Sequence, residues 1–124
     1  MAQIITLPNV TDPKGSLTIV EKVLPFEIKR VYYIHHVSNG SVRGGHRHKV
    51  TQQALICVAG SCEISIDNGS QKENVALDAP TKCLVLAPED WHTMQHFSTD
   101  AVLLVLASEY YDAADYIDEP YGVR

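Results

Sequence analysis

The sequence predicts an all-β protein, either a sandwich or a barrel of short strands. Val, Ile, Leu and Tyr gather in short runs, and Gly, Pro, Asn and Asp separate these runs. Only one short segment near the C-terminus has a helical pattern. Short strands with frequent turns are typical of sandwiches and barrels. A barrel of this kind encloses a cavity lined by inward-facing residues, which is a natural site for a small ligand.

The expected strands follow one another along most of the chain. They are rich in β-branched and aromatic residues, which favour strands. We expect strands at residues 3–7, 17–23, 28–37, 51–58, 61–67, 72–77, 83–87, 93–97 and 101–107. We expect the turns between them at 12–15, 38–40, 44–45, 59–61, 67–69 and 88–90.

Three local patterns are more specific than the general strand signal. Asp-Asn-Gly at 67–69 lies between two strand-like runs, which predicts a hairpin. Apolar and polar residues alternate over 61–66, so this strand should have one buried and one solvated face. Asp112 can cap a short helical turn over 112–117, which we expect to pack on the end of the barrel.

Size and charge limit the classes of function. A chain of 124 residues predicts one domain, spanning 1–124. The net charge of −5 and the few, short basic groupings argue against nucleic acid as the partner. No early apolar run is long enough for a signal peptide or a membrane span, so we expect no membrane association. The three cysteines form no CxxC and lie in apolar runs, which fits buried thiols in a reducing cytoplasm.

The stretch 43–49 carries the strongest functional signal. His46 and His48 lie two residues apart in a strand-like run, so their side chains point the same way. Such a pair is either a metal clamp or an acid–base device. A metal site of this pattern needs a carboxylate five residues later, and this chain has the uncharged Gln53 there. The pair therefore favours proton transfer.

This spacing resembles the first cupin motif in outline. The motif positions are occupied by Gly44, His46, His48, Gln53 and Gly60. The segment 88–92 resembles the second cupin motif, in which His92 would be the third metal ligand. The resemblance implies a single-domain jelly-roll barrel, or double-stranded β-helix, with a short C-terminal helical turn. Because Gln53 replaces the usual Glu, we expect no bound metal.

The chain resembles more closely the sugar-nucleotide 3,4-ketoisomerases, also described as WxcM-like cupins. The matching pieces are Gly15-Ser16-Leu17, 25–34, 43–49 with Gln53, Gly60-Ser61, Trp91 with Met94, Phe97-Ser98, 102–108, Tyr111-Asp112 and 115–117. The resemblance implies an enzyme without metal or other cofactor, which converts dTDP-4-keto-6-deoxyglucose to a dTDP-3-keto-6-deoxyhexose. The 3-keto sugar would be aminated to a 3-amino-3,6-dideoxyhexose for surface polysaccharide. The resemblance also implies a homodimer whose N-terminal strands cross to the partner's sheet.

Proton transfer of this kind needs a base, an acid and donors that stabilise an enediolate. By motif position, the resemblance implies that His46 is the base. His48, on the same strand face, would hold the substrate or move a proton between its oxygens. Tyr32 falls on the same face as Arg30 by alternation, so it can donate a hydrogen bond to a sugar oxygen.

The remaining expected contacts are with the nucleotide and the sugar. The diphosphate needs cations, and we expect Arg30 and Arg43 to supply them, with Lys14 and Arg47 in support. The other expected substrate-binding residues are Gln53, Trp91 and Gln95. We interpret Trp91 as a wall of the pocket or as core.

Two of these positions depart from the family pattern. Lys14 stands where relatives often have Arg, before Gly-Ser-Leu. Gln95 lies where relatives with different product stereochemistry differ. The sequence therefore leaves open whether the product is the galacto or the gluco 3-keto sugar.

Three other functions remain open at this level. A metal-dependent cupin enzyme would contain stoichiometric metal and lose activity on chelation. A sugar-nucleotide epimerase would also abstract a proton beside the ketone, but it would leave the carbonyl in place. A non-catalytic cupin would bind the nucleotide sugar without exchanging its hydrogens.

Overall fold

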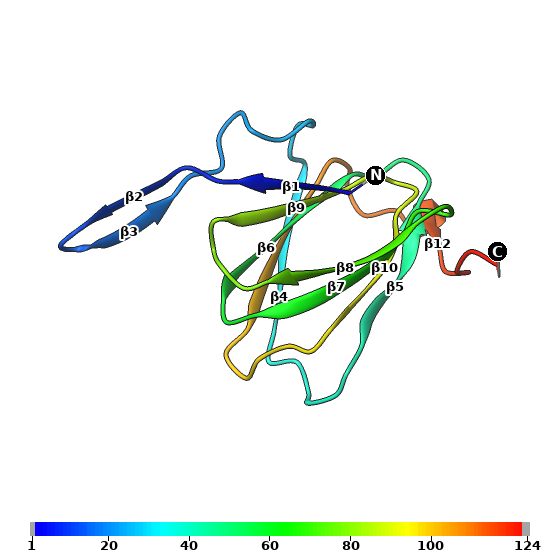
Figure 1. The fold of residues 1–124 in the computed structure, drawn as a ribbon. Helices are drawn as coiled ribbons and strands as arrows, with labels where there is room; N and C mark the ends of the chain where they lie inside the picture. The colour runs from blue at the N-terminus through cyan, green and yellow to red at the C-terminus, as the bar shows by residue number, and fades with distance from the viewer. Residues whose placement is uncertain (1, 123–124) are drawn as a thin grey trace.

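A computed structural model, which describes residues 2–122, contains two five-stranded antiparallel sheets that face each other (Figure 1). The first sheet contains, in order, β1 (Gln3–Thr6), β9 (Lys82–Leu86), β6 (Gln53–Ala59), β11 (Val102–Ala107) and β4 (Arg30–His35). The second contains β12 (Tyr116–Ile117), β5 (Arg43–His48), β10 (Trp91–Gln95), β7 (Cys62–Asp67) and β8 (Lys72–Leu77). The all-β prediction is confirmed.

The main core lies between the two sheets, and a second apolar layer covers the outside of the first sheet. Leu55 and Leu103 are fully buried in the main core. Ile56, on the other face of β6, packs instead with Leu7 and with apolar side chains from residues 20–26. Because both faces of β6 are covered, its apolar run is continuous rather than alternating.

The structure confirms several local expectations and corrects others. Strands β7 and β8 form the expected hairpin, in which the Gly69 N–H donates to Asp67 Oδ1 at 2.9 Å. The strand expected at 17–23 is wrong beyond Thr18, because residues 20–26 cover the first sheet as an irregular segment. Strand β2 (Asn9–Asp12) was not among the strands expected from the sequence. Both of its faces are exposed, so it lacks the alternation of buried and exposed residues that marks a strand.

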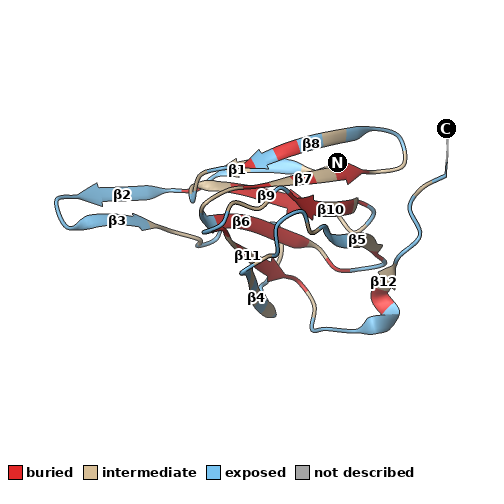
Figure 2. Cartoon of the chain, turned by 90° about the horizontal axis from the view of Figure 1, so that it is seen from below, coloured by how far each residue is buried: buried red, intermediate tan, exposed pale blue. Residues whose placement is uncertain are grey.

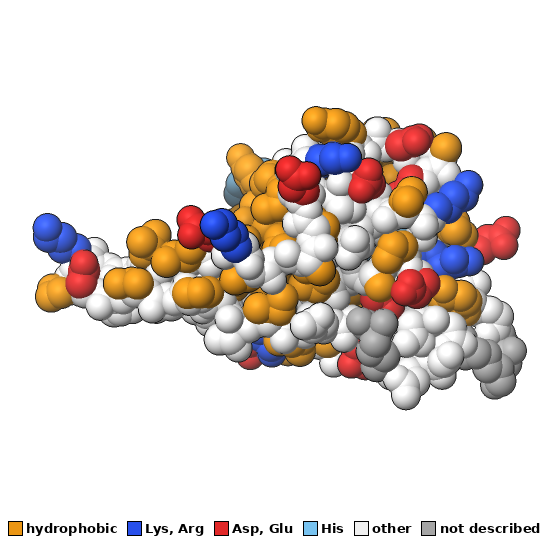
Figure 3. Space-filling model, turned by 90° about the horizontal axis from the view of Figure 1, so that it is seen from above, with side chains coloured by type: hydrophobic (Ala, Val, Ile, Leu, Met, Phe, Trp, Pro, Cys, Tyr) orange, Lys and Arg blue, Asp and Glu red, His pale blue; other side chains and the backbone are white. Residues whose placement is uncertain are grey.

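Strand β2 pairs with β3 (Gly15–Thr18) in a hairpin, here called the arm, that projects from the two sheets (Figures 1 and 2). Val10 and Leu17 are register partners on it and are 55% and 61% exposed. Figure 3 shows apolar side chains along the length of the arm. A two-stranded hairpin standing alone in water is only marginally stable, so this surface lacks a packing partner within the described chain.

The C-terminal segment returns to the second sheet. Asp112 caps the short 3-10 turn η1 (Ala113–Asp115), and its side chain accepts a hydrogen bond from the Ala114 N–H at 3.0 Å. This confirms the expected cap and helical turn. The chain then passes directly into β12, which pairs with β5 so that Tyr116 lies opposite His48.

The three cysteine thiols are unpaired and buried, as expected for small apolar side chains. Within residues 2–122, none of the helical structure is long and apolar enough to cross a membrane.

Candidate active site

A cleft of about 410 Å³ opens between β4 and β5. It is lined by Arg30, Tyr32, Tyr33, Ile34, His35, Arg43, Gly44, His46, Met94 and Tyr116. Four of the residues predicted for the site, Arg30, Tyr32, Arg43 and His46, are therefore brought together at one opening.

His46 lies on β5 opposite His92 of β10. The close approach of the two strands depends on Gly44, which has φ +81° and whose added Cβ would lie 3.0 Å from the His92 carbonyl oxygen. Burial and the neighbouring His48 lower the pKa of His46 below its ordinary value of 6.5. The imidazole is therefore neutral at neutral pH and able to accept a proton.

His48 lies behind His46, with the two ring centroids 5.1 Å apart. It is only 4% exposed, and its Nδ1 lies 2.8 Å from Asp115 Oδ2. The Tyr116 ring packs against both histidines: its centroid lies 4.7 Å from the ring centroid of His46 and 4.6 Å from that of His48. The C-terminal segment thus packs directly against the histidine pair.

His92 completes a cluster of three imidazoles with His46 and His48. Its ring centroid is 5.2 Å from that of His46, and its side chain is 1% exposed. The His92 Nδ1–H donates to the Asp90 carbonyl at 3.0 Å. Burial lowers the pKa of His92 to about 4, and the charges of the other two histidines add to this effect.

This pKa predicts that stability falls on acidification. In the unfolded chain His92 titrates near 6.5, so between pH 6.5 and 4 the unfolded state binds a proton that the native state does not. We expect a loss of about 3 kcal/mol in the free energy of unfolding across this window. Urea denaturation at a series of pH values measures it.

The same series has an internal control. Hydrogen bonds hold the pKa of Asp115 at about 2, so its contribution is lost only at more acidic pH, as the pH falls through that pKa. A His92→Gln variant should show a flatter dependence between pH 6.5 and 4. If the stability of this variant depended on pH as strongly as that of the wild type, a group other than His92 would cause the loss of stability.

Tyr32 and Gln53 form a hydrogen-bonded pair beside the cleft. The Gln53 amide Nε2 donates to the Tyr32 hydroxyl at 3.2 Å, so the hydroxyl keeps its own proton to donate. Burial raises the pKa of Tyr32, which keeps the phenol neutral. The Gln53 side chain is thus directed towards a tyrosine. Among residues 2–122, no group of three or more His, Cys, Asp or Glu side chains is arranged to hold a metal ion.

Two cations lie at the cleft. The Arg30 guanidinium lies 4.5 Å from the Tyr32 ring centroid and 5.2 Å from that of Tyr111, which holds it in place. Arg43 is exposed where β5 begins. A planar guanidinium group can donate two parallel hydrogen bonds to two oxygens of one phosphate, so these arginines can hold an anionic group at the cleft.

Four predicted substrate contacts lie away from the cleft in this chain. Arg47 alternates with the two inward-facing histidines, and its guanidinium lies 4.7 Å from the Tyr121 ring on the outer face. Gln95 is likewise on the outer face, where its Nε2 donates to Glu63 and Ser65. The alternation of side chains along β5 and β10 thus directs both residues away from the cleft of the same chain.

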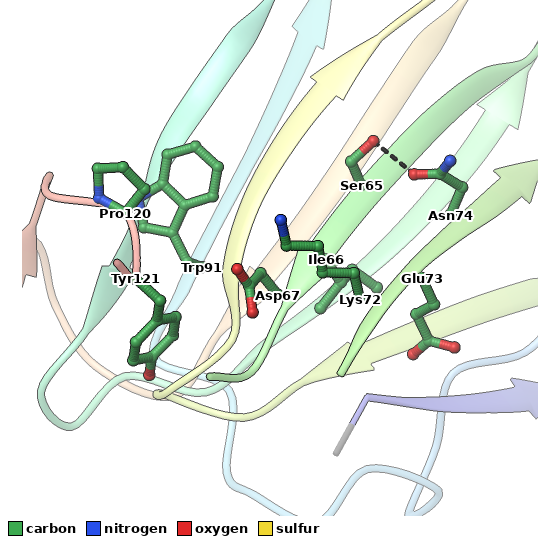
Figure 4. A pocket seen from close by; sticks show the side chains of 9 residues that line it. All are labelled: Ser65, Ile66, Asp67, Lys72, Glu73, Asn74, Trp91, Pro120 and Tyr121. Carbon is green, nitrogen blue, oxygen red and sulfur yellow. Dashed lines mark hydrogen bonds between the residues drawn. The ribbon is translucent and has the colours of Figure 1, made fainter. Parts of the chain in front are cut away.

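Trp91, also predicted to contact the substrate, lines a separate pocket of about 360 Å³ on the outside of the second sheet (Figure 4). Its Nε1–H donates to the Asp118 carbonyl at 3.1 Å, and Tyr121 lies across from it. Lys14 is also remote, because it lies in the turn at the tip of the arm. A contact between Lys14 and substrate would need a second copy of the chain.

The sequence reasoning assigned no role to two residues that the structure brings to the histidines. Asp115 and Tyr116 lie in one of the matching pieces, but their position depends on β12, a strand of only two residues. Nothing in so short a strand reveals its partner or its register.

Two facing antiparallel sheets with a histidine-containing cleft between β4 and β5 define a cupin-like protein with a candidate site for proton transfer. The sequence matches the family described as FdtA: WxcM-like, C-terminal, over residues 1–122. It is 44% identical over 117 residues to the TDP-4-oxo-6-deoxy-alpha-D-glucose-3,4-oxoisomerase of Aneurinibacillus thermoaerophilus, covering 93% of this chain and 84% of that one. The chain belongs to this family.

Solved structures of sugar 3,4-ketoisomerases are similar to this chain in both sequence and fold. The sugar 3,4-ketoisomerase QdtA of Thermoanaerobacterium thermosaccharolyticum, in complex with TDP, is 42% identical with a TM-score of 0.92, covering 95% of this chain and 88% of that one. A variant of QdtA has been solved with TDP-4-keto-6-deoxyglucose. The TDP-quinovose 3,4-ketoisomerase WlaRB of Campylobacter jejuni is 43% identical with a TM-score of 0.91, covering 95% and 92%. These likenesses confirm the resemblance and the cupin-like fold.

Proposed function

We propose that this protein is a sugar-nucleotide 3,4-ketoisomerase that converts dTDP-4-keto-6-deoxyglucose to a dTDP-3-keto-6-deoxyhexose. The observation that carries the proposal is a neutral histidine, His46, beside two arginines in a cleft of a chain that resembles such enzymes over nearly its whole length. Arg30 and Arg43 would bind the diphosphate. The product would be a substrate for a transaminase.

The reaction rearranges hydrogens without adding or removing atoms. His46 would take the proton from C3, and the electrons of that bond would form the C3–C4 double bond of an enediolate. The Tyr32 hydroxyl would donate a hydrogen bond to the developing negative charge on the C4 oxygen. The proton from the C3 hydroxyl would pass to the C4 oxygen, and C4 would receive a proton from the enzyme. The ketone then lies at C3.

Incubation with dTDP-4-keto-6-deoxyglucose in deuterated water tests the proposal by NMR. We expect a 3-keto sugar with deuterium at C4, and the coupling constants of the same spectrum distinguish galacto from gluco product. An epimerase would introduce deuterium but leave the carbonyl at C4. A sample that forms no 3-keto sugar and incorporates no deuterium would rule out the proposed activity.

We also infer that two copies form a homodimer through the arm. Its paired Val10 and Leu17 are exposed in a hairpin that has little stability alone. A second copy packed on this face would bury both side chains, and it would let Lys14 contact the partner's substrate. The buried, unpaired cysteines fit a cytoplasmic setting for the enzyme.

A double substitution tests the arm. Val10→Ser with Leu17→Ser removes the apolar face, so we expect sedimentation to show a dimer for the wild type and a monomer for the variant. Val50→Ser, at an exposed valine outside the arm, is the matched control and should remain dimeric. A variant that still sediments as a dimer would place the interface elsewhere.

A further inference from the structure

The feature behind this inference is the carboxylate of Asp115, which is buried beside the histidine pair. Its Oδ2 accepts hydrogen bonds from His48 Nδ1 at 2.8 Å and from Thr51 Oγ1 at 2.5 Å. Its Oδ1 accepts from the backbone N–H groups of Lys49 at 3.1 Å and Val50 at 2.8 Å. Four donors converge on one side chain that is only 6% exposed.

This arrangement keeps Asp115 ionised. Burial alone would raise the pKa of the carboxyl, but the hydrogen bonds from Thr51, Val50 and His48 lower it to about 2. An ionised carboxylate can only accept hydrogen bonds. The hydrogen between Asp115 and His48 must therefore be carried by the imidazole, on Nδ1.

In the neutral form of His48, the other ring nitrogen, Nε2, is therefore a bare acceptor. A neutral imidazole carries one hydrogen, so Nε2 has none when Nδ1 is protonated. Among the described residues, Nε2 is buried and has no hydrogen-bond partner. Leaving a buried acceptor without a partner costs free energy, so this nitrogen is available to accept a proton or a hydrogen bond from a ligand. The neighbouring His46 opens onto the cleft.

We propose that Asp115 is a positioning residue that fixes His48 as the Nδ1–H tautomer, so that its Nε2 can accept a proton during the reaction. The proposal rests on the 3,4-ketoisomerase function. His46 takes the proton from C3, while His48 Nε2 takes the proton of the C3 hydroxyl and returns it to the C4 oxygen. Asp115 stabilises the imidazolium that exists between these two transfers.

The position of Asp115 comes from the C-terminal segment. Pairing of β12 with β5 sets Tyr116 opposite His48, and the turn η1 places Asp115 immediately before it. The Lys49 N–H also donates to the Asp115 backbone carbonyl at 2.9 Å. Both the backbone and the side chain of Asp115 are thus tied to residues that follow His48, and the carboxylate cannot turn away without breaking these bonds.

Asp115→Asn tests the proposal because it keeps the shape and removes the charge. The Asn amide donates towards His48 Nδ1, which must then accept, and the ring hydrogen moves to Nε2. We expect kcat to fall by up to about 10⁴-fold, the loss that follows when the aspartate that fixes the histidine tautomer of a Ser-His-Asp triad is replaced by Asn, with little change in KM. Deuterium exchange at C3, which needs only His46, should continue.

The tautomer is measured directly, without substrate. Long-range ¹H–¹⁵N correlation spectra of the histidine rings should show His48 as Nδ1–H in the wild type and as Nε2–H in the variant. Asp112→Asn is the matched control, because it makes the same change at the exposed cap of the same turn, where Asn can still accept the Ala114 bond. It should keep the wild-type tautomer and the wild-type kcat.

Several results would overturn the inference. An Nε2–H tautomer in the wild type would do so, even if the Asp115→Asn protein failed to fold. A folded variant that changes tautomer but keeps kcat would remove Asp115 from the reaction, and so would loss of C3 exchange together with isomerisation. If the wild type makes no 3-keto sugar while the tautomer changes as expected, the proposed function fails and the hydrogen-bond geometry stands.

Discussion

His46→Asn is expected to abolish formation of the 3-keto sugar while leaving the protein folded and able to bind nucleotide. The variant lacks the group assigned as base, and a positioned general base contributes about 10²- to 10⁴-fold to a rate. Deuterium exchange at C3 should disappear with turnover, in contrast to Asp115→Asn. The arginines at the cleft remain, so calorimetry should still detect binding of dTDP.

His96→Asn is the control for this experiment. His96 has an exposed side chain and φ +53°, a backbone conformation that Asn tolerates well. The same substitution at this position should leave turnover and thermal unfolding unchanged. An active His46→Asn enzyme would transfer the role of base to another group, and His48 would then be the first to examine.

Gly60→Ala is expected to cause a large loss of stability. Gly60 has φ +64°, and an added Cβ would lie 2.2 Å from Ser98 Oγ and 2.9 Å from the Ala101 Cα. The Ser98 hydroxyl is already engaged, since it accepts from the Ser61 N–H at 2.9 Å. The left-handed backbone costs about 1–2 kcal/mol for Ala, and overpacking costs about 1–3 kcal/mol. We expect about 2–5 kcal/mol in urea denaturation.

Gly40→Ala separates the two contributions. Gly40 has φ +79°, but its added Cβ would meet no described atom within 4 Å. This variant should lose only the cost of the left-handed backbone, about 1–2 kcal/mol. Equal losses in the free energy of unfolding at both positions would show that Ser98 and its neighbours move away from the added Cβ of residue 60 at little cost.

The sequence was most informative where side chains alternate between solvent and core. Strand β7 has that alternation, and its hairpin with β8 was predicted from the Asp-Asn-Gly turn. The same rule placed His46 and His48 on one face. Applied to Arg47, which lies between them, it would also have predicted that this side chain leaves the cleft.

Other features depend on contacts that a single sequence does not reveal. The arm has no buried face within one chain, so no apolar pattern marks β2. The pairing of β12 with β5 joins residues 67 positions apart, His48 and Asp115, through a two-residue strand. Only the folded structure brings that carboxylate to the histidine.

Because β12 has only two residues, its separation from β5 is a local opening that leaves the longer strand pairs of both sheets intact. Such an opening removes Asp115 and Tyr116 from the histidines together. We therefore expect a local equilibrium at the edge of the second sheet, separate from global unfolding, to set the population of catalytically competent molecules. Heating or mild denaturant should reduce turnover before it melts the sheets, and amide hydrogen exchange at β12 should follow the loss of activity.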